Sequence, residues 1–462
     1  MLRRERYDVV IVGAGAFGLA TAYYLAEARP DLHLLVVDAR SGPGEGSMGA
    51  SNAMVRDVFS SWDNHVLANS SIASYRRRME EHEELRAPTP LVDLYGYLWM
   101  LSERQRAEFA ALLGRTEHPI DHEWVSLEGL ETCPGLVRAP SRWFEGETAP
   151  PPEPIVAGLF GRTCGAVAPE LLAQFFHEGA RSKGVEFAFD TTVQRLSFEG
   201  RDEVLLNERS ALPFAFQEQI PGRLRVARVR FGDGGSVATE RVVVAAGAWA
   251  DKILHPIGVA TSCTPRPELL YSASGKVVEE LLTWRPPVRP LDPGAAGARF
   301  PFVILPTGAM LKPIFVQRQM WVGYLDTVAH PIGVREDPGR DGRLDFRMAA
   351  MGERDAFGTD VLPTVSPYLP GFETDGVRLE NAWGGYYNFS PDGLPIVSDE
   401  PNGVVFVGGD SGSGVMKADA IGRIVAAVVD GRPTARLFTG ETYEVARLSL
   451  RARAAEREQI IL

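Results

Sequence analysis

The sequence predicts an α/β protein with a parallel β-sheet, because two βαβ units and several apolar runs of strand length occur along the chain. Residues 7–12 form a short β-branched run. Helix-forming residues follow over 17–28 and end at Arg29-Pro30, and residues 32–37 form a second apolar run. A strand, a helix and a strand in this order are typical of a unit that joins parallel strands.

The second βαβ unit lies in the middle of the chain. Residues 169–183 predict an amphipathic helix, Gly184 ends it, and residues 185–189 predict the next strand. Two further runs, 241–246 and 404–407, are short and apolar. Such runs are typical of strands that are buried on both faces of a parallel sheet.

Segments of a different character interrupt these units. Residues 91–101 are rich in aromatic and β-forming residues, and residues 302–326 alternate in polarity as antiparallel strands do. Ser102 and Gln105 predict a capping box for a helix that ends near Leu113. The two kinds of segment interleave, so we predict two discontinuous domains. The first comprises residues 1–92, 158–265 and 390–462, and the second comprises residues 93–157 and 266–389.

The composition is that of an ordinary globular protein of two or three domains. The chain has 462 residues and a net charge of −12, with 45% hydrophobic and 23% charged residues. The acidic balance, with no long basic run, argues against a nucleic-acid partner. Cys133, Cys164 and Cys263 are scattered and form no metal-binding or disulfide pattern. We therefore expect no metal site and a cytoplasmic location.

Neither end of the chain is expected to enter a membrane. Residues 9–28 are apolar, but Asp8 precedes them and three glycines interrupt them, which argues against a signal peptide or a span. Residues 441–462 predict an Arg-rich helix that packs on the protein or joins two copies, because one short helix on an acidic protein binds a bilayer weakly. Residues 205–225 are an insertion that shapes an interface or forms a long hairpin.

The turn after the first strand carries a G-x-G-x-x-G motif. Gly13 allows the tight turn, Gly15 lets the backbone approach a pyrophosphate, and Gly18 permits close packing of the helix. Asp38 ends the second strand, where its carboxylate can accept a hydrogen bond from a ribose hydroxyl. The motif with its strand, helix and acid predicts a dinucleotide site for FAD or NAD, whose ribose carries no phosphate at this position.

Two later segments favour FAD over NAD. Residues 242–249 run from a strand into a glycine turn, and the Gly/Ser-rich residues 408–414 begin a helix. The N-terminus of a helix carries partial positive charge. This charge suits the anionic edge of a reduced flavin.

The segments together resemble the superfamily of FAD-dependent oxidoreductases that includes D-amino acid oxidase, glycine oxidase and sarcosine oxidase, over nearly the whole chain. The matching segments are YDVVIVGAGAFGLATAYYLA with Asp38, GSMGASNAMVR, GAVAPELLAQFF, VVVAAGAWADKIL, WGGYYNFSPDGLPIV and GGDSGSGVMKADAIGR. The resemblance implies a p-hydroxybenzoate hydroxylase-like fold, in which the first domain binds FAD and an antiparallel sheet holds the substrate over the flavin.

The motifs and the resemblance together indicate the site residues. The expected FAD-binding residues are Gly13, Gly15, Ala16, Phe17, Gly18, Asp38, Ala39, Arg40, Ser47, Ala50, Ser51, Val193, Ala246, Gly247, Trp249, Gly385, Asp410, Gly412, Ser413, Gly414, Val415 and Met416. The expected catalytic residues are Arg56, Tyr386, Tyr387, Met416 and Lys417. A largely aromatic pocket that suits an amine would be lined by Trp383, Tyr386, Tyr387, Met416 and Lys312.

Four of these positions carry specific expectations. Gly385 matches a cysteine that is covalently tied to flavin in sarcosine oxidase, so we expect non-covalent FAD. Tyr387 stands where many amino acid oxidases place an arginine for the substrate carboxylate, and a phenol cannot form that bidentate pair. Arg56 supplies positive charge to the flavin or the substrate, or forms a structural salt bridge. Met416 matches a lysine that promotes the reaction of reduced flavin with oxygen.

Lys417 follows Met416 by one residue, about 100° around the helix. It reaches the flavin only if the start of the helix is irregular, and otherwise it is a surface lysine beside Asp419. We therefore expect a slow reaction with O2 and an acceptor such as a quinone or an electron-transfer protein.

The resemblance implies an FAD-dependent oxidoreductase that removes a hydride from the carbon beside the nitrogen of a small amine or amino acid, with secondary and N-methyl amines favoured. Two alternatives stay open. One is an FAD-dependent 2-hydroxy acid dehydrogenase on the same fold. The other is a flavoprotein without turnover that acts as an assembly or regulatory factor.

Overall fold

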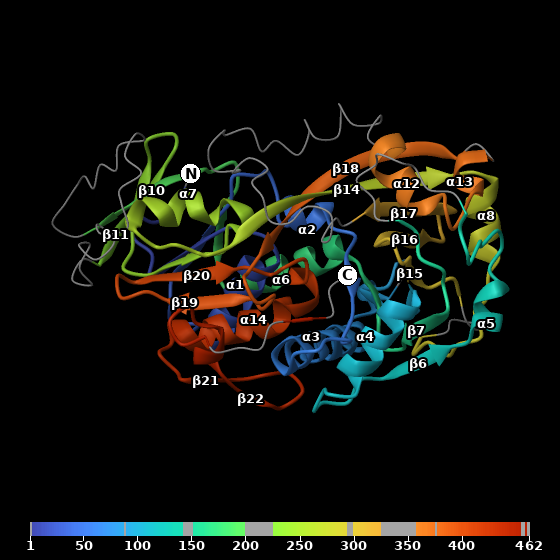
Figure 1. Cartoon of the computed structure of the whole chain (residues 1–462). Helices are drawn as coiled ribbons and strands as arrows, with labels where there is room; N and C mark the ends of the chain where they lie inside the picture. Colours follow the sequence, from blue (N-terminus) through green and yellow to red (C-terminus); the bar gives the residue numbers. More distant parts are fainter. Residues whose placement is uncertain are drawn as a thin grey trace.

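The computed structural model describes residues 2–86, 89–141, 151–198, 225–292, 299–324, 357–374, 377–453 and 458–459. The molecule is elongated and has two lobes (Figure 1). A largely parallel sheet forms the centre of one lobe, and a largely antiparallel sheet forms the other. The mixed α/β fold predicted from the sequence is confirmed.

The first sheet has six strands in the order β19-β20-β13-β1-β2-β9. All neighbouring strands are parallel except β19 and β20. The strands are β1 (Val9–Val12), β2 (Leu34–Val37), β9 (Glu186–Ala188), β13 (Val242–Val244), β19 (Ile396–Asp399) and β20 (Val404–Gly408). The predicted apolar runs therefore pair in one sheet, and its central strands are buried on both faces.

The alternation of side chains along these strands divides the lobe into two apolar layers. Val9 and Ile11 pack with helices on one face, whereas Val10 and Val12 pack with a small antiparallel sheet on the other. The helices are α1 (Ala16–Ala28), α3 (Trp62–Glu81), α6 (Pro169–Ser182) and α14 (Gly414–Val429). The small sheet consists of β10 (Val193–Phe198), β11 (Val226–Phe231) and β12 (Ser236–Ala238), and α7 (Ala250–Leu254) lies beside it.

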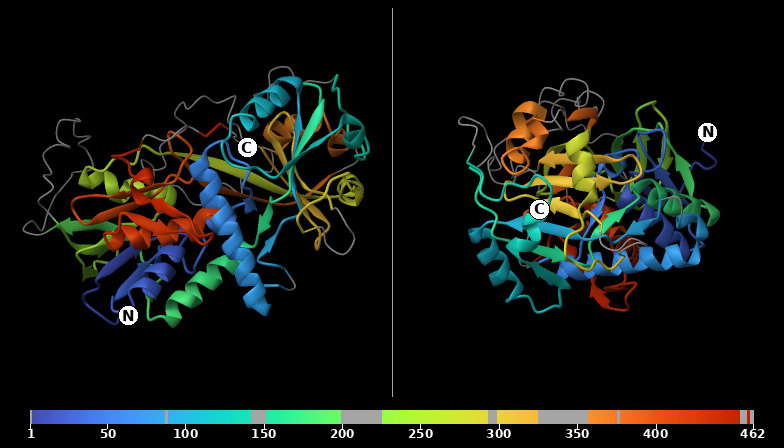
Figure 2. Two further views of the ribbon diagram at one scale, coloured as in Figure 1. Left: turned by 90° about the horizontal axis from the view of Figure 1, so that it is seen from below. Right: turned by 90° about the vertical axis from the view of Figure 1, so that its right-hand side faces the viewer.

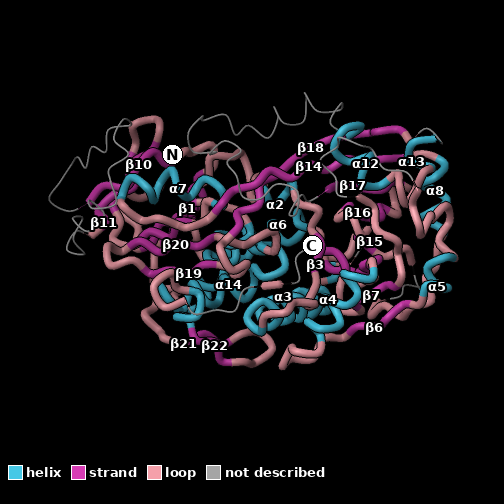
Figure 3. Tube along the Cα trace, in the orientation of Figure 1, coloured by secondary structure: helices cyan, strands magenta, loops and turns pink. Residues whose placement is uncertain are grey.

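The second lobe is built on an eight-stranded sheet in the order β18-β14-β17-β16-β15-β5-β7-β6. Its strands are β5 (Tyr97–Leu101), β6 (His122–Val125), β7 (Ala157–Gly161), β14 (Thr264–Ser274), β15 (Phe302–Ile304), β16 (Ala309–Ile314), β17 (Gln319–Tyr324) and β18 (Arg378–Phe389). Strands β14 and β18 are the longest and run from one lobe into the other (Figures 1 and 3). They bring the second sheet up to the first.

Shorter elements complete the two lobes. They are α2 (Ser47–Ala50), β3 (Met54–Val55), β4 (Val92–Asp93), α4 (Glu103–Leu113), α5 (Leu127–Glu131), β8 (Gly165–Val167), α8 (Lys276–Thr283), α12 (Leu362–Val365), α13 (Gly371–Thr374), β21 (Thr434–Arg436) and β22 (Thr442–Glu444). The predicted capping box of α4 forms between Ser102 and Gln105. The long helix α3 crosses the molecule between the lobes (Figure 2). No helix in the described part of the chain is long and apolar enough to cross a membrane.

The C-terminal segment differs from the predicted helix. Strand β22 pairs with β21, and residues 445–448 form one 3₁₀ turn. Its arginines instead bind separate carboxylates on the body of the protein. The ion pairs join Arg447 to Asp63, Arg451 to Glu400, and Arg453 to Asp392.

Two sequence-based expectations remain untested. The insertion over 205–225 lies outside the described residues. The domain boundaries stay a prediction, although β7 pairs within the eight-stranded sheet, so a boundary after Gly161 follows the sheets better than one before residue 158.

Candidate functional site

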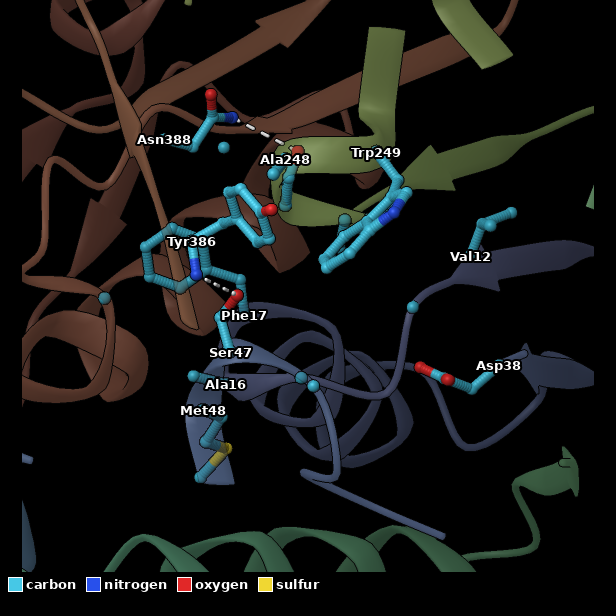
Figure 4. A pocket seen from close by; sticks show the side chains of 18 of the residues that line it. Val12, Ala16, Phe17, Asp38, Ser47, Met48, Ala248, Trp249, Tyr386 and Asn388 are labelled. Atoms are coloured by element: carbon cyan, nitrogen blue, oxygen red, sulfur yellow. Dashed lines mark hydrogen bonds between the residues drawn. The ribbon is translucent and has the colours of Figure 1, made fainter. Parts of the chain in front are cut away.

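A cavity of about 480 Å³ opens at one edge of the six-stranded sheet. Its walls come from the turns that follow β1, β2, β13 and β20. These strands are parallel, so their carboxyl ends meet at the same edge, where open α/β sheets bind ligands. Figure 4 shows Asp38 at one side of the cavity and Tyr386 at the other, with the turn before Ala16 between them.

The three glycines of the motif have distinct surroundings. Gly13 has a φ of +107°, and a Cβ there would lie 2.4 Å from the carbonyl oxygen of Ala245. A Cβ on Gly18 would lie 1.9 Å from the carbonyl oxygen of Gly13. A Cβ on Gly15, by contrast, would have no neighbour within 4 Å. Gly15 therefore borders open space at the N-terminus of α1. This space can hold a pyrophosphate group.

Asp38 is held in a defined orientation at the end of β2. Its Oδ2 accepts a hydrogen bond from the Ala14 amide at 2.6 Å, and its Oδ1 accepts one from the Arg40 amide at 2.8 Å. Burial raises the pKa of Asp38, and these two amides oppose that rise. The fixed carboxylate on the cavity wall fits the recognition of ribose hydroxyls.

The opposite wall of the cavity is formed by β18. The Tyr386 amide donates to Ser47 Oγ at 3.3 Å, and Asn388 Nδ2 donates to the carbonyl of Gly247 at 3.1 Å. The Trp249 and Tyr386 rings meet edge to face, with centroids 5.9 Å apart (Figure 4). Tyr386, on a strand of the second lobe, thus forms an aromatic wall of a cavity in the first lobe.

The loop before α14 forms the third side of the cavity. Gly409, Ser411 and Gly412 all have positive φ values, so the chain turns tightly there. Asp410 Oδ2 accepts a hydrogen bond from the Gly414 amide at 3.2 Å, and burial raises the pKa of Asp410 to about 6. The N-terminus of α14 therefore meets the cavity, where its partial positive charge favours an anion.

Most of the predicted FAD-binding residues line this cavity. They are Gly13, Gly15, Ala16, Phe17, Asp38, Ala39, Arg40, Ser47, Ser51, Val193, Ala246, Gly247, Trp249, Asp410, Gly412, Gly414 and Val415. Tyr386 and Tyr387 line it too. The predicted residues that do not line it are Gly18, Ala50, Arg56, Gly385, Ser413, Met416 and Lys417.

The Lys417 side chain is fully buried, so the expectation of a surface lysine is wrong. Its Nζ donates to Asn64 Oδ1 at 2.5 Å and to Ser413 Oγ, and it lies 4.6 Å from the centroid of the Phe59 ring. Arg56 lies over the same ring at 4.2 Å. Burial lowers the pKa of Lys417 to about 7. Helix α14 packs against α1 and α3, which leaves no exposed side at this position.

Met416 does not line the cavity and packs in the core around α1. The prediction of a slow reaction with oxygen depended on Met416 lying at the flavin. Because this side chain does not line the cavity, the slow reaction stays a prediction without structural support. Lys312 is buried on β16, donates to the carbonyl of Asn52, and lies 4.6 Å from the centroid of the Trp321 ring. Burial lowers its pKa to about 8.

Sequence reasoning missed several residues of the cavity. The wall also includes Val12, Val37, Gly46, Met48, Thr191, Thr192, Ala245, Ala248, Lys252, Ile253, Asn388, Val407 and Gly408. Thr191 and Thr192 follow β9, and the rule that ligands bind at the carboxyl ends of strands predicts their place. Sequence reasoning also missed Glu268 on β14, whose signal was a single carboxylate directly before the apolar residues 269–271.

The residues present fit FAD. The ribose acceptor Asp38, the pyrophosphate cradle at Gly15 and the aromatic wall at Tyr386 follow one another along one cavity. Together with the two-lobed fold, they define a flavoprotein with a Rossmann-type cofactor domain.

A family model described as DAO, FAD dependent oxidoreductase, matches residues 8–428, and the chain belongs to this family. The chain is 27% identical over 446 residues to FAD-dependent oxidoreductase domain-containing protein 1 of Bos taurus, a match that covers 92% of this chain and 81% of that protein. The predicted FAD cofactor and oxidoreductase class are thus confirmed.

Solved structures share the fold. Glycine oxidase from Geobacillus kaustophilus has a TM-score of 0.66 at 19% identity, and the match covers 97% of this chain and 99% of that chain. L-proline dehydrogenase from P. horikoshii has a TM-score of 0.65 at 19% identity, with coverage of 93% and 94%.

Proposed function

We propose that the protein oxidises the C–N bond of a small amine or amino acid with non-covalently bound FAD. The observation that carries this proposal is the cavity wall formed by β18, because it brings the antiparallel sheet directly against the cofactor cavity. The two solved structures named above are a glycine oxidase and an L-proline dehydrogenase, and both names refer to donors that contain an amine.

The chain's own residues would hold and orient the cofactor. Gly15 and the N-terminus of α1 cradle the pyrophosphate, and Asp38 binds the ribose. Tyr386 and Trp249 shield the other end of the cavity from water. Bound FAD supplies a two-electron acceptor, so that a hydride leaves the carbon beside the nitrogen and the resulting imine takes up water to give a carbonyl compound and a free amine or ammonia.

Gly385 supports non-covalent binding. It has no side chain that can bond to the flavin, and a Cβ at this position would lie 3.3 Å from Ala50 Cβ. We expect denaturation in acid, followed by filtration, to release all the yellow colour from the protein. Flavin that stays with the denatured chain would overturn this part of the proposal.

The test of the reaction is an anaerobic titration of the purified holoenzyme with pooled donors. The pools are primary amines, N-methyl amines, cyclic amino acids and 2-hydroxy acids. We expect an amine or amino acid pool to bleach the oxidised flavin band. Bleaching by the 2-hydroxy acids alone would replace the proposed donor class, and no bleaching by any pool would favour a flavoprotein without turnover.

A further inference from the structure

Strands β14 and β18 pair along most of their length and form a long two-stranded ribbon, and one face of this ribbon lies toward the cofactor cavity. Glu268 on β14 pairs with Gly385 on β18. Because side chains alternate along a strand, Glu268 shares its face with Gly385, Trp383 and Tyr387. Trp383 Nε1 donates to the carbonyl of Ala50 at 3.1 Å, and Tyr387 lines the cavity. Glu268 therefore lies on the cofactor side of the sheet.

Glu268 is a buried carboxylate whose hydrogen bonding is incomplete. Glu268 is only 4% exposed, and its Oε1 has no hydrogen-bond partner among the described residues. Tyr387 is the side chain that forms a hydrogen bond with it. Burial raises the pKa of Glu268 to about 7, and the nearby Tyr387 hydroxyl limits that rise.

A second buried polar atom nearby is also without a partner. Tyr97 on β5 packs in the same apolar cluster as Tyr387, and its hydroxyl has no hydrogen bond in the described structure. Burial raises the pKa of both tyrosines, and the charge of Glu268 raises it further. The other charged groups around this cluster are Arg56, which acts on Tyr97, and Asp410, which acts on Tyr387.

The burial of these two unpaired polar atoms destabilises the folded protein unless a ligand forms hydrogen bonds with them. A buried polar atom without a partner destabilises the folded protein, and a buried carboxylate does so more strongly. Among the side chains that the structure describes, no lysine or arginine contributes to the pKa of Glu268, and its hydrogen-bonding side chain is Tyr387. A carboxylate between aromatic rings is the chemistry that recognises a cationic nitrogen.

We propose that Glu268 binds the positively charged nitrogen of the donor and accepts its proton, with Tyr387 and Tyr97 beside it. This inference rests on the proposed amine oxidation. The proton passes from the ammonium nitrogen to a carboxylate oxygen of Glu268, which leaves a neutral amine and a carboxylic acid and changes no oxidation state. The neutral amine is the form that can give up a hydride.

The same arrangement selects the class of donor. A donor carboxylate would be repelled by the buried Glu268 anion, and Tyr387 offers it no bidentate charged pair. The preferred donor is therefore a cationic amine without a carboxylate on the reacting carbon.

A binding experiment tests the cation site without turnover. tert-Butylammonium has no hydrogen on the carbon beside its nitrogen, so it cannot be oxidised, and pivalate has the same shape with the opposite charge. Each is titrated into the holoenzyme at pH 8 while the flavin absorption is followed. We expect saturable binding of tert-butylammonium that weakens at least tenfold in Glu268→Gln, and weaker binding of pivalate than of tert-butylammonium.

The matched control is Glu400→Gln. Glu400 is also a buried carboxylate, but its oxygens accept from Ser398 Oγ at 2.9 Å and from Arg451 Nη2 at 2.6 Å, and it follows β19 in the first lobe, outside the β14–β18 ribbon. We expect Glu400→Gln to bind tert-butylammonium as the wild type does. Equal affinity of wild type and Glu268→Gln, no spectral change with the wild type, or tighter binding of pivalate would each overturn the proposal.

A kinetic experiment tests the proton transfer. In anaerobic stopped flow we expect the rate of flavin reduction in Glu268→Gln to rise about tenfold per pH unit above pH 7, because this variant must capture the neutral amine from solution. The wild-type rate should level off near pH 7 to 8. Identical pH profiles would refute the role of Glu268 and leave amine oxidation standing, whereas a wild type that no amine bleaches would refute the oxidation itself.

Folding is checked with thermal unfolding. Replacement of a buried carboxylate by a neutral amide should leave Tm unchanged or raise it, as is common for functional residues that cost stability. A fall in Tm for Glu268→Gln would indicate a structural role. Glu268→Asp then serves as a second variant, because it keeps the charge and should retain more tert-butylammonium binding than the amide does.

Discussion

Gly15 and Gly18 belong to one motif, but they face different surroundings. Gly15 borders the open space of the cavity, whereas a Cβ on Gly18 would collide with the Gly13 carbonyl. We expect Gly15→Ala to keep its fold without cofactor and to bind FAD at least tenfold more weakly, because the new methyl group occupies space for the pyrophosphate. We expect Gly18→Ala to lower the unfolding free energy by about 1–3 kcal/mol or more through overpacking.

The measurements are FAD titration by fluorescence quenching and thermal unfolding of both variants without cofactor. A Gly15→Ala protein with wild-type affinity for FAD would show that the cradle is not at this turn. Equal stability losses in the two variants would show that both glycines serve packing alone.

Lys417 predicts a specific dependence of stability on pH. Burial lowers its pKa from the ordinary 10.5 to about 7, so between these pH values the unfolded chain binds a proton that the folded chain does not. The unfolding free energy therefore gains up to about 1.4 kcal/mol per pH unit as pH rises through this window, and below pH 7 this contribution is flat.

We expect Lys417→Met to lack this gain. The readout is the difference between wild-type and variant unfolding free energies from urea titrations at pH 7, 8 and 9. Lys276→Met is the control, because the Lys276 side chain is 76% exposed and should leave the slope unchanged. Parallel curves for wild type and Lys417→Met would contradict the prediction.

At the residue scale, Lys417 and Glu268 show which properties could not be predicted from the sequence. The helical rotation between Met416 and Lys417 was predicted from the chain, but the burial of both depends on α1 and α3, which are remote in sequence. Asp38 and the glycines could be predicted because their roles depend on a local strand, turn and helix. Glu268 could not be assigned a role, because its partners come from other strands.

At the scale of elements, Glu458 joins the end of the chain to the start of α3. Its two carboxylate oxygens accept hydrogen bonds from the backbone amides and hydroxyls of Ser60 and Ser61, and Asn64 Nδ2 donates to Oε2. A carboxylate at the N-terminus of a helix is favourable for the helix dipole. Nearby Arg56 and the donors of Ser60 and Ser61 hold its pKa below the ordinary value, although burial opposes this.

We expect Glu458→Ala to lower the unfolding free energy by about 2 kcal/mol, since it removes charge-assisted hydrogen bonds to buried donors. Chemical denaturation at pH 7 measures this loss. Gln459→Ala is the neighbouring control with an expected change below about 0.5 kcal/mol, because in the described part of the chain its side chain accepts one bond, from exposed Arg115. Equal stability of wild type and Glu458→Ala would refute the cap.

The elements that could be predicted were those with a strong local pattern. The strands β1, β2, β13 and β20 and the helices α1, α4 and α6 lie within a few residues of their expected ranges. The C-terminal segment was mispredicted because its arginines suit a helix in isolation. In the folded protein, ion pairs with Asp63, Glu400 and Asp392 hold that segment in extended and turn conformations.

At the scale of the whole molecule, the cavity belongs to both lobes. Asp38 and Gly15 come from the first lobe, and Tyr386 to Asn388 come from the long strand of the second. We expect FAD at 100 times its dissociation constant to raise the unfolding free energy by about 2.7 kcal/mol. Because both lobes contact the ligand, calorimetry should show the transitions of both lobes moving to higher temperature. A shift of only one of two transitions would contradict a shared site.

The interleaving of two sheets was predictable from the alternation of segment types along the chain. The strand order of the eight-stranded sheet was not, because its pairings are non-local. Strand β15 pairs with β5 in parallel, and β14 pairs with β18, across long stretches of intervening chain. Pairings of this kind depend on tertiary packing and leave no periodic signal in the sequence.

The neighbouring positions of α1 and α14 impose an order of events during synthesis. The glycine turn and α1 are made long before α14, which begins at Gly414 and packs against α1. Until α14 leaves the ribosome, the side of α1 that packs against α14 is uncovered, although α6 is already present, and the third wall of the cavity is missing. The cofactor cavity is therefore complete only after residue 429 has been made and α14 has packed against α1.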